Sequence, residues 1–248
     1  MGFKLSGNPA MEAGLFEPDE TQLVSSVLAH VEVMINVGAN IGYYACLALS
    51  RGKQVVAFEP VARNLEYLLR NIKANGWESS AEVFPIALSD KVGVTKIYGS
   101  GTGASLVRGW SGIPENYSRL VPMSTMDKVV GSRFAGRKCL VLVDIEGAEQ
   151  LMLDGASYLL DMTPKPLWFV EIVVSEHQPR GRTLNPTLLR TFSTFLDRGY
   201  EAWTASSQPR LVEAEEVARV QSTGRDTLAT HNFLFVGKGT GESLFFGQ

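Results

Sequence analysis

Short hydrophobic runs rich in Val, Ile and Phe alternate along the chain with longer segments whose hydrophobic residues recur at helical spacing. The main strands predicted from these runs are Val33–Val37, Gln54–Phe58, Val83–Ala87, Leu140–Asp144, Leu167–Val174, Tyr200–Thr204 and Asn232–Val236. Helices are predicted at Asp19–Ala29, after the Gly38–Gly42 turn through Ser50, from Pro60 to about Asn75, at Gly147–Leu160 and at Asn185–Arg198. Regular alternation of strands and helices predicts a parallel sheet covered by helices on both faces. We therefore expect an α/β, Rossmann-like fold with a seven-stranded, mostly parallel sheet.

The alternation is interrupted between Gly93 and Gly131, where an irregular insertion is predicted near the functional site. It begins with a short strand at Val94–Tyr98. The segment Gly99–Tyr117 follows, and its glycines and its tryptophan suggest a lid over a bound substrate. Residues 1–31 form a helical segment before the sheet, so residues 1–248 are predicted to make one domain.

Composition narrows the classes of protein that the chain can belong to. Of the 248 residues, 45% are hydrophobic and 20% charged, which is typical of a globular protein. The net charge of -3 gives no electrostatic reason to expect a nucleic-acid partner. The two cysteines, Cys46 and Cys139, do not support a disulfide framework or a cysteine metal site, which fits a reducing cytoplasm. No apolar run approaches the roughly 20 residues of a membrane span.

A glycine loop follows the first predicted strand and opens a helix. This arrangement lets a ligand approach a helix N-terminus closely. The dinucleotide fingerprint G-x-G-x-x-G lacks its middle glycine here, because Asn40 stands between Gly38 and Gly42. A ligand without phosphates at this point, such as the methionyl tail of S-adenosylmethionine, fits better than a pyrophosphate. An NAD-dependent oxidoreductase stays the alternative, as does a loop that only shapes a turn.

Carboxylates follow two of the predicted strands. Glu59 ends the second strand, where a carboxylate can accept hydrogen bonds from both hydroxyls of a ribose or can cap the next helix. Asp144, Glu146 and Glu149 follow a later strand, at the sheet edge where ligands of α/β proteins bind. They can accept protons, bind an ammonium group or hold a metal. Glu146 and Glu149 can also simply stabilise the positive end of a helix dipole.

Two further residues are candidates for acid–base chemistry. Glu171 lies in an otherwise apolar strand and needs a partner or a ligand there. His177 lies in the polar loop beyond it, and an imidazole can accept a proton near neutral pH. We take His177 as the first candidate for a base and Asp144 as the second, although a loop histidine can also be merely exposed to solvent. His30 and His231 are predicted to be structural.

Five ordered motifs resemble the FkbM family of S-adenosylmethionine-dependent methyltransferases, over roughly residues 17–175. The motifs are Ile35–Tyr44, Ala57–Pro60, Ala87–Asp90, Ser124–Asp127 and Asp144–Glu149. The resemblance implies the class I methyltransferase form of the Rossmann-like fold and S-adenosyl-L-methionine as the cofactor.

The resemblance also implies roles for individual residues. The glycine loop would border the methionyl part of the donor, Glu59 would hold the ribose, and Ala87 with Leu88 would flank the adenine. Asp144 and Glu146 would face the sulfonium and the acceptor. The donor-binding residues assigned in this way are Asn36, Gly38, Asn40, Gly42, Glu59, Ala87, Leu88 and Asp144. The catalytic candidates are His177, Asp144, Glu146 and Glu171.

Family members commonly methylate hydroxyls of sugars, glycans or polyketide-like products, which makes a small molecule or a glycan the expected acceptor. No Asp/Asn-Pro-Pro-Tyr motif, which is expected for adenine or glutamine amines, follows the strand that ends at Asp144, so O-methylation is favoured. No metal is predicted, because the Asp-Asn pair typical of catechol-type enzymes is absent; Asp144 and Glu171 would be the pair for a cation. A binding module without catalysis is a further alternative, and the pattern predicts no oligomeric state.

Overall fold

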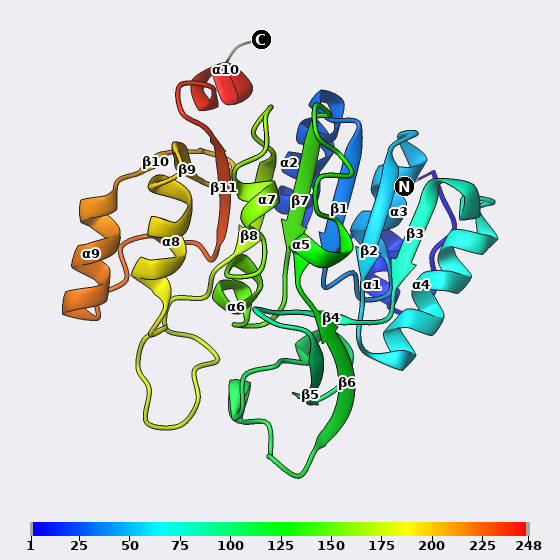
Figure 1. The fold of residues 1–248 in the computed structure, drawn as a ribbon, viewed down its shortest axis with the longest axis horizontal. Coiled ribbons are helices and arrows are strands. Elements are labelled where there is room, and N and C mark those ends of the chain that lie inside the picture. Colours follow the sequence, from blue (N-terminus) through cyan, green and yellow to red (C-terminus); the bar gives the residue numbers. More distant parts are fainter. Residues whose placement is uncertain (1, 247–248) are drawn as a thin grey trace.

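The computed structural model describes residues 2–246, and within them two sheets are present (Figure 1). The larger sheet has eight strands in the order β10-β9-β11-β8-β7-β1-β2-β3. Its strands are β1 Val33–Val37, β2 Gln54–Phe58, β3 Ala81–Phe84, β7 Cys139–Val143, β8 Leu167–Glu171, β9 Tyr200–Thr204, β10 Leu211–Val212 and β11 Asn232–Gly237. The five neighbouring strands β3, β2, β1, β7 and β8 are parallel to one another, and β11 runs antiparallel to both β8 and β9. The predicted Rossmann-like α/β fold is confirmed.

The predicted count of seven strands is wrong, because the described part of the sheet has eight. The additional strand is the two-residue β10, which pairs with the end of β9 and is too short to produce a hydrophobic pattern. The strand predicted at Val83–Ala87 is also divided. β3 ends before Pro85, and Ala87–Leu88 forms β4 of the smaller sheet. Proline has no N–H group to continue the pairing.

Helices cover both faces of the large sheet (Figure 1). One face carries α1 Pro9–Ala13, α2 Pro18–Val27, α3 Tyr43–Ser50 and α4 Ala62–Ala74. The other carries α5 Met126–Val129, α6 Glu149–Leu153, α7 Ser157–Leu160, α8 Leu188–Leu196 and α9 Ala214–Thr223, while α10 Gly241–Phe246 follows β11. The single helix predicted at Gly147–Leu160 is therefore wrong. It is divided at Gly155, where a Cβ would overlap the backbone carbonyl of Ser89.

Alternate residues of each central strand pack on opposite faces of the sheet. In β1, Val33, Ile35 and Val37 belong to the core under α5–α9, whereas Met34 belongs to the core under α1–α4. Asn36 has the same parity as Met34 and is 1% exposed. Because side chains alternate along a strand, Asn36 is a polar group on the α1–α4 face of the sheet.

The insertion predicted as irregular contributes two strands to a small second sheet, in the order β4-β6-β5, and β4 precedes the insertion. The strands of this sheet are β4 Ala87–Leu88, β5 Gly93–Tyr98 and β6 Ser118–Ser124, and they lie beyond the lower edge of the large sheet in Figure 1. The β6 strand was not predicted, since Pro122 within it indicates against a strand. Ile97, Val121 and Met123 pack against Val61, which follows β2. This contact fixes the insertion against the edge of the large sheet at which its parallel strands have their carboxyl ends, called the carboxyl edge below.

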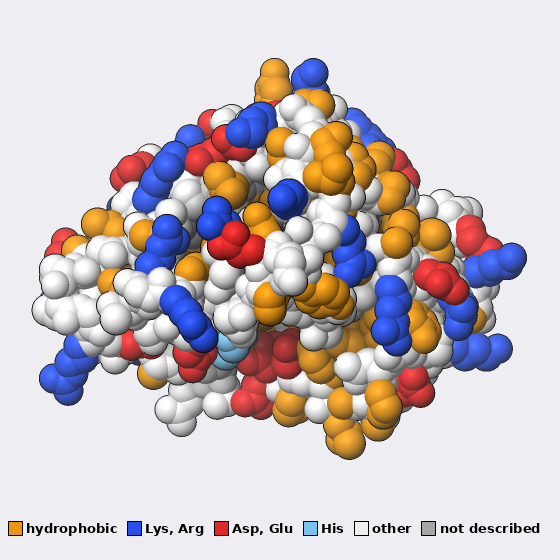
Figure 2. Space-filling view, turned by 90° about the horizontal axis from the view of Figure 1, so that it is seen from below, with side chains coloured by type: hydrophobic (Ala, Val, Ile, Leu, Met, Phe, Trp, Pro, Cys, Tyr) orange, Lys and Arg blue, Asp and Glu red, His pale blue; other side chains and the backbone are white. Residues whose placement is uncertain are grey.

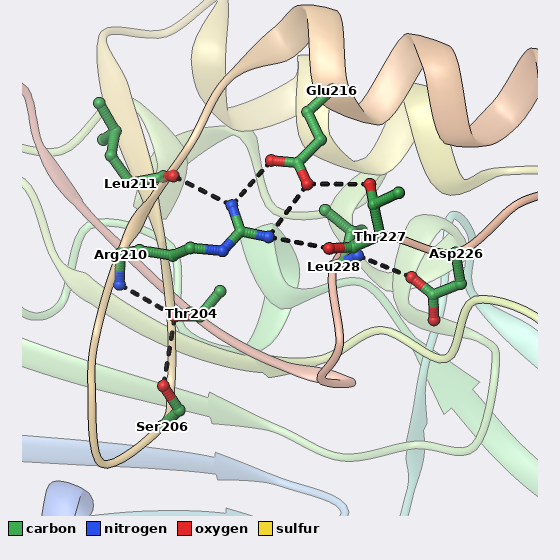
Figure 3. Close-up of polar contacts among 8 residues, drawn as sticks. All are labelled: Thr204, Ser206, Arg210, Leu211, Glu216, Asp226, Thr227 and Leu228. Carbon is green, nitrogen blue, oxygen red and sulfur yellow. Dashed lines mark hydrogen bonds and ion pairs between the residues drawn. The ribbon is translucent and has the colours of Figure 1, made fainter.

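At the β10 side of the large sheet, one arginine joins the β9–β10 hairpin to α9 (Figure 3). The guanidinium of Arg210 donates to both carboxylate oxygens of Glu216, at 2.7 and 3.0 Å. It also donates to the backbone oxygen of Thr227, whose hydroxyl donates to Glu216. Arg210 and Glu216 thus form a two-bond ion pair, and Arg210 also fixes the loop that leads into β11. None of the helices in residues 2–246 is long and apolar enough to cross a membrane.

Candidate active site

The neighbouring strands β2, β1 and β7 end level with one another at the edge that faces the insertion, and β8 ends one residue further along. Val37 of β1 pairs with Phe58 of β2 and with Val143 of β7, in parallel register. The next residue along each of these strands is Gly38, Glu59 and Asp144, respectively. Val143 also pairs with Val170, which places Glu171, the last residue of β8, beside Asp144. Gly38, Glu59 and Asp144, which were predicted from separate motifs, therefore meet at one edge of the sheet.

The glycine loop after β1 folds tightly over that edge. Gly38 has φ +82°, and a Cβ there would overlap the backbone oxygen of Asp144. Only glycine fits this close contact without displacing the neighbouring strand. The N–H groups of Gly38 and Ala39 both donate to the oxygen of Phe58, at 3.0 and 2.9 Å. The loop is thereby tied to β2, and Asn40, at φ +51°, lies beside Glu59.

Glu59 is a buried carboxylate that is held by the protein backbone. It accepts hydrogen bonds from the N–H of Asn40 at 2.8 Å and from the N–H of Val61 at 2.7 Å. The side-chain amide of Asn64 donates to it as well, at 3.4 Å. Its side chain is 4% exposed, and desolvation raises its pKa to about 7 despite these bonds. A ligand that donates hydroxyl hydrogens to Glu59 would favour its ionised form.

A cavity opens between the glycine loop, Glu59 and the insertion. Seven of the sequence-predicted site residues line it: Gly38, Asn40, Glu59, Ala87, Leu88, Asp144 and Glu146. Apolar side chains form the wall around Ala87 and Leu88, namely Phe58, Ile86, Ile97 and Leu106. The cavity therefore has an apolar part, which suits a planar base, and a carboxylate-lined part, which suits hydroxyl and ammonium groups.

The sequence did not identify all of the residues that line this cavity. Asn64, which is buried on α4, and Gly101, Thr102 and Ala104 of the insertion also line it. The Asn64 amide donates to the backbone oxygen of Gly101 at 3.0 Å, which links α4 to the insertion across the cavity. The available signal was an asparagine at helical spacing from Leu68 and Ile72, on the buried face of a predicted helix. The contribution of the insertion had no comparable local signal.

Asp144 and Glu171 form a pair of carboxyl groups joined by a hydrogen bond. Desolvation raises the pKa of Asp144 well above its ordinary value, and the neighbouring negative charge of Glu171 raises it further. Desolvation likewise raises the pKa of Glu171 to about 7. Two adjacent carboxylates disfavour double ionisation, so the pair retains one proton well above pH 4.5. Asp144 is thus the partner that the sequence required for Glu171.

The turn after Asp144 is held in an unusual backbone conformation by the insertion. Glu146 has φ +56° and Gly147 has φ +89°. The backbone oxygen of Glu146 accepts from the hydroxyl of Ser105 at 2.6 Å, and its carboxylate accepts from the indole N–H of Trp110 at 2.7 Å. A Cβ on Gly147 would overlap the Trp110 ring. Trp110 is 2% exposed, so Gly99–Tyr117 packs on the edge in this structure. Its movement as a lid stays a prediction.

Glu149, the first residue of α6, is a second buried acid beside this turn. It is 4% exposed, and its carboxylate accepts from the N–H of Gly147 at 2.8 Å. Desolvation raises its pKa to about 8. Glu149 accepts a hydrogen bond from Gly147, and the Trp110 ring packs against the same glycine. The two side chains therefore hold the turn that carries Glu146.

His177 lies on the loop after β8 and touches the insertion. Its side chain is exposed, and its Nδ1 lies 3.1 Å from the hydroxyl of Ser111. Its ring centroid is 6.0 Å from that of Trp110. His177 does not line this cavity, but it reaches the same edge through Trp110 and Glu146. Among the described residues, its Nε2 has no hydrogen-bond partner.

Two of the predicted donor-binding residues, Asn36 and Gly42, do not line the cavity. Asn36 lies behind the glycine loop, and its buried Oδ1 has no hydrogen-bond partner among the described residues. A buried acceptor without a donor is costly unless a ligand or water satisfies it. Gly42 begins α3 at φ +93° and packs against Leu68, so its role is to shape the loop.

The carboxyl edge is acidic in its centre. Figure 2 shows acidic side chains gathered beside a histidine in the hollow at this edge, with apolar and basic side chains around them. The N-terminal segment adds to this group, since the carboxylate of Glu17 accepts from the hydroxyl of Tyr44 at 2.8 Å. The carboxylates are nevertheless not grouped as metal ligands: within residues 2–246 no cluster of three or more His, Cys, Asp or Glu side chains has a suitable arrangement.

Comparison with known proteins assigns a family to this arrangement. The Methyltransferase FkbM domain matches residues 36–202, which include the glycine loop, Glu59, the insertion and the acidic edge. No curated protein matches the chain.

Three solved structures illustrate the fold similarity. A methyltransferase FkbM from Methylobacillus flagellatus KT is 17% identical, with a TM-score of 0.49; the match covers 83% of this chain and 43% of that one. This chain thus corresponds to less than half of that protein. A putative O-methyltransferase from Klebsiella pneumoniae is 11% identical, covering 94% and 92%, with a TM-score of 0.47. A putative RNA methyltransferase from Pyrococcus horikoshii is 12% identical, covering 95% and 94%, with a TM-score of 0.43.

Proposed function

This chain belongs to the FkbM methyltransferase family, and from that premise we propose that it transfers a methyl group to a hydroxyl of a sugar, glycan or natural product. The family assigns S-adenosylmethionine as the cofactor. The observation that supports the proposal is the single cavity that joins Glu59 and the apolar wall at one end to Asp144 and Glu146 at the other. A donor placed along it would bring its reactive end to the acidic edge.

The cavity residues fit this cofactor. We propose that Glu59 accepts hydrogen bonds from the ribose hydroxyls, that Ala87 and Leu88 contact the adenine, and that the Gly38–Gly42 loop borders the methionyl group. Asn36, with its unsatisfied Oδ1, and Asp144 complete the proposed set. When bound, S-adenosylmethionine supplies an electrophilic methyl group. The missing middle glycine at Asn40 and the family match together favour this cofactor over a nicotinamide dinucleotide.

The protein must position the acceptor and accept its proton. Alignment of donor and acceptor supplies a large part of the rate in such displacements. We propose His177 as the base, because its Nδ1 is held by Ser111 while its Nε2 is available for a hydroxyl. The Asp144–Glu171 pair is the second candidate, since Glu171 has a pKa of about 7 and Asp144 lines the cavity. Glu146 is proposed to contact the acceptor.

Turnover with labelled donor and a panel of glycosides tests this function. We expect methylated product that carries the label on oxygen, and we expect His177→Ala to lower turnover while donor affinity is kept. The pH–rate profile of Glu171→Gln serves as the comparison, because it shifts only if the carboxyl pair is the base. Donor binding without any methylated product would indicate a binding module. A labelled methyl group on a nitrogen atom of the product would contradict the O-directed reaction.

A further inference from the structure

Two loops meet beside His177 and line a second, open groove. The N–H of Ser111 donates to the backbone oxygen of His177 at 2.6 Å, and the Ser111 hydroxyl reaches its Nδ1. Gly109 packs against Pro179 on the other loop. The insertion and the loop after β8 therefore form the two walls of one groove, and the proposed base stands at the point where they join.

The groove is basic. Arg108, Arg180 and Arg182 line it, together with one acid, Glu115. Glu115 is already bound by Arg108 at 2.5 Å. Within the part of the chain that the structure describes, the guanidinium groups of Arg180 and Arg182 have neither an ion pair nor a hydrogen bond, and both side chains are exposed. These two guanidinium groups are thus free to bind an anion.

This positive charge lies next to the negative charge of the acidic edge. Basic side chains are visible next to the histidine in Figure 2, on the side away from the acidic hollow. Glu146, Asp144 and Glu171 would repel an anionic group, whereas Arg180 and Arg182 would attract it. A molecule with an anionic group and a hydroxyl would therefore bind in one orientation, with its anion in the groove and its hydroxyl toward His177.

We propose that this groove binds an anionic group of the acceptor, namely a phosphate, sulfate or carboxylate. Arg180 and Arg182 are the specificity-determining residues, because a guanidinium presents paired donors to such oxygens. That the bound molecule is the methyl acceptor rests on the function proposed above. That the groove binds anions rests only on its own residues.

Calorimetry with small sugar anions tests the groove without any methyl transfer. The probes are glucose 6-phosphate, glucose 6-sulfate and glucuronate, with methyl glucoside as the neutral reference. We expect at least one anion to bind saturably and the double variant Arg180→Gln, Arg182→Gln to weaken it about 10-fold or more. The preferred probe identifies the anionic group. The matched control is Arg219→Gln with Arg225→Gln, which removes two exposed positive charges near α9 and should leave Kd unchanged.

Three results would overturn the proposal: no saturable binding of any anion to the unaltered protein, equal binding to the groove variant, or equal weakening in the control. Displacement of the sugar anion by an equimolar oligoribonucleotide would assign the groove to RNA and also overturn it. Donor binding is measured on the same variants and should be unchanged. If the anion binds but no acceptor, anionic or neutral, is methylated, the groove stands and the proposed function fails.

Discussion

Charged side chains are arranged differently in two clusters, one at the β9–β10 side of the large sheet and one at the carboxyl ends of its central strands. In the Arg210–Glu216 cluster each charge has a partner of opposite sign, and the hydrogen bond between them lowers the pKa of Glu216 and raises that of Arg210. At the carboxyl edge Glu59 and Glu149 are buried and Glu171 is half-buried, all without a cation, and desolvation raises the pKa of each. The first cluster favours the ionised forms and the second disfavours them.

The difference separates charges that stabilise the fold from charges that bind something else. A paired carboxylate such as Glu216 adds to stability when ionised. Buried acids without a cation reduce stability at neutral pH, and a protein retains them where a ligand or a reaction needs them. The contrast predicts that substitutions at the edge change binding and pH dependence, whereas substitutions around Arg210 change stability alone.

The largest effect on donor binding is expected for Glu59→Ala. The variant loses the carboxylate proposed to accept the ribose hydroxyls, and hydrogen bonds to a charged group contribute about 1.5–3 kcal/mol. We expect donor affinity in calorimetry to fall about 100-fold, with Glu216→Ala as the control that keeps it. Unchanged affinity for the donor in Glu59→Ala would remove Glu59 from the site.

A smaller loss is expected for Gly147→Ala. Alanine disfavours φ +89°, and its Cβ would overlap the Trp110 ring that also binds Glu146. Strain of this kind costs about 1–3 kcal/mol. Chemical denaturation should show that loss, and turnover should fall because Glu146 is displaced. Gly239→Ala, at a similar φ of +81° with open space around it, controls for the backbone strain alone.

The pH dependence of stability should have the sign that buried acids produce. Glu149 has a pKa of about 8 when folded and 4.5 as its ordinary value, so the native state keeps a proton that the unfolded chain loses. The free energy of unfolding should therefore fall as pH rises from about 4.5 to 8, by up to about 1.4 kcal/mol per pH unit for such a group. Glu149→Gln should flatten this slope in thermal melts of the ligand-free protein. An unchanged slope would show that Glu149 is ionised in the native state.

The smallest effect is expected for Glu216→Gln. The substitution weakens a partly exposed ion pair, which is worth about 1 kcal/mol. Urea denaturation should show that decrease at neutral pH, while donor affinity and turnover stay the same. A loss of donor affinity here would abolish the distinction between the two clusters.

The fold could be predicted from sequence wherever local pattern determines it. The strands Val33–Val37, Gln54–Phe58 and Tyr200–Thr204 are confirmed at both ends, since hydrophobic runs bounded by polar or turn residues define them. The β6 strand was missed because Pro122 obscures its alternation. The division of the helix at Gly155 depends on a contact with Ser89, which is distant in sequence.

The candidate site was predictable to the same extent. Gly38, Glu59 and Asp144 each follow a strand directly, so the parallel sheet alone brings them together. Asn64 and Gly101 meet through the path of the insertion, and Glu17 reaches the edge only because the N-terminal helices fold over Tyr44. Such long-range contacts leave no periodic signal in the sequence.

The level ends of β1, β2 and β7 make this edge sensitive to length. A residue deleted from any of these strands would withdraw its terminal group by ~3.3 Å and turn the following side chains to the other face. Substitutions within the strands leave the spacing intact. Related chains that keep the same reaction should therefore differ freely in the apolar residues of these strands, while insertions and deletions should be confined to the connecting loops.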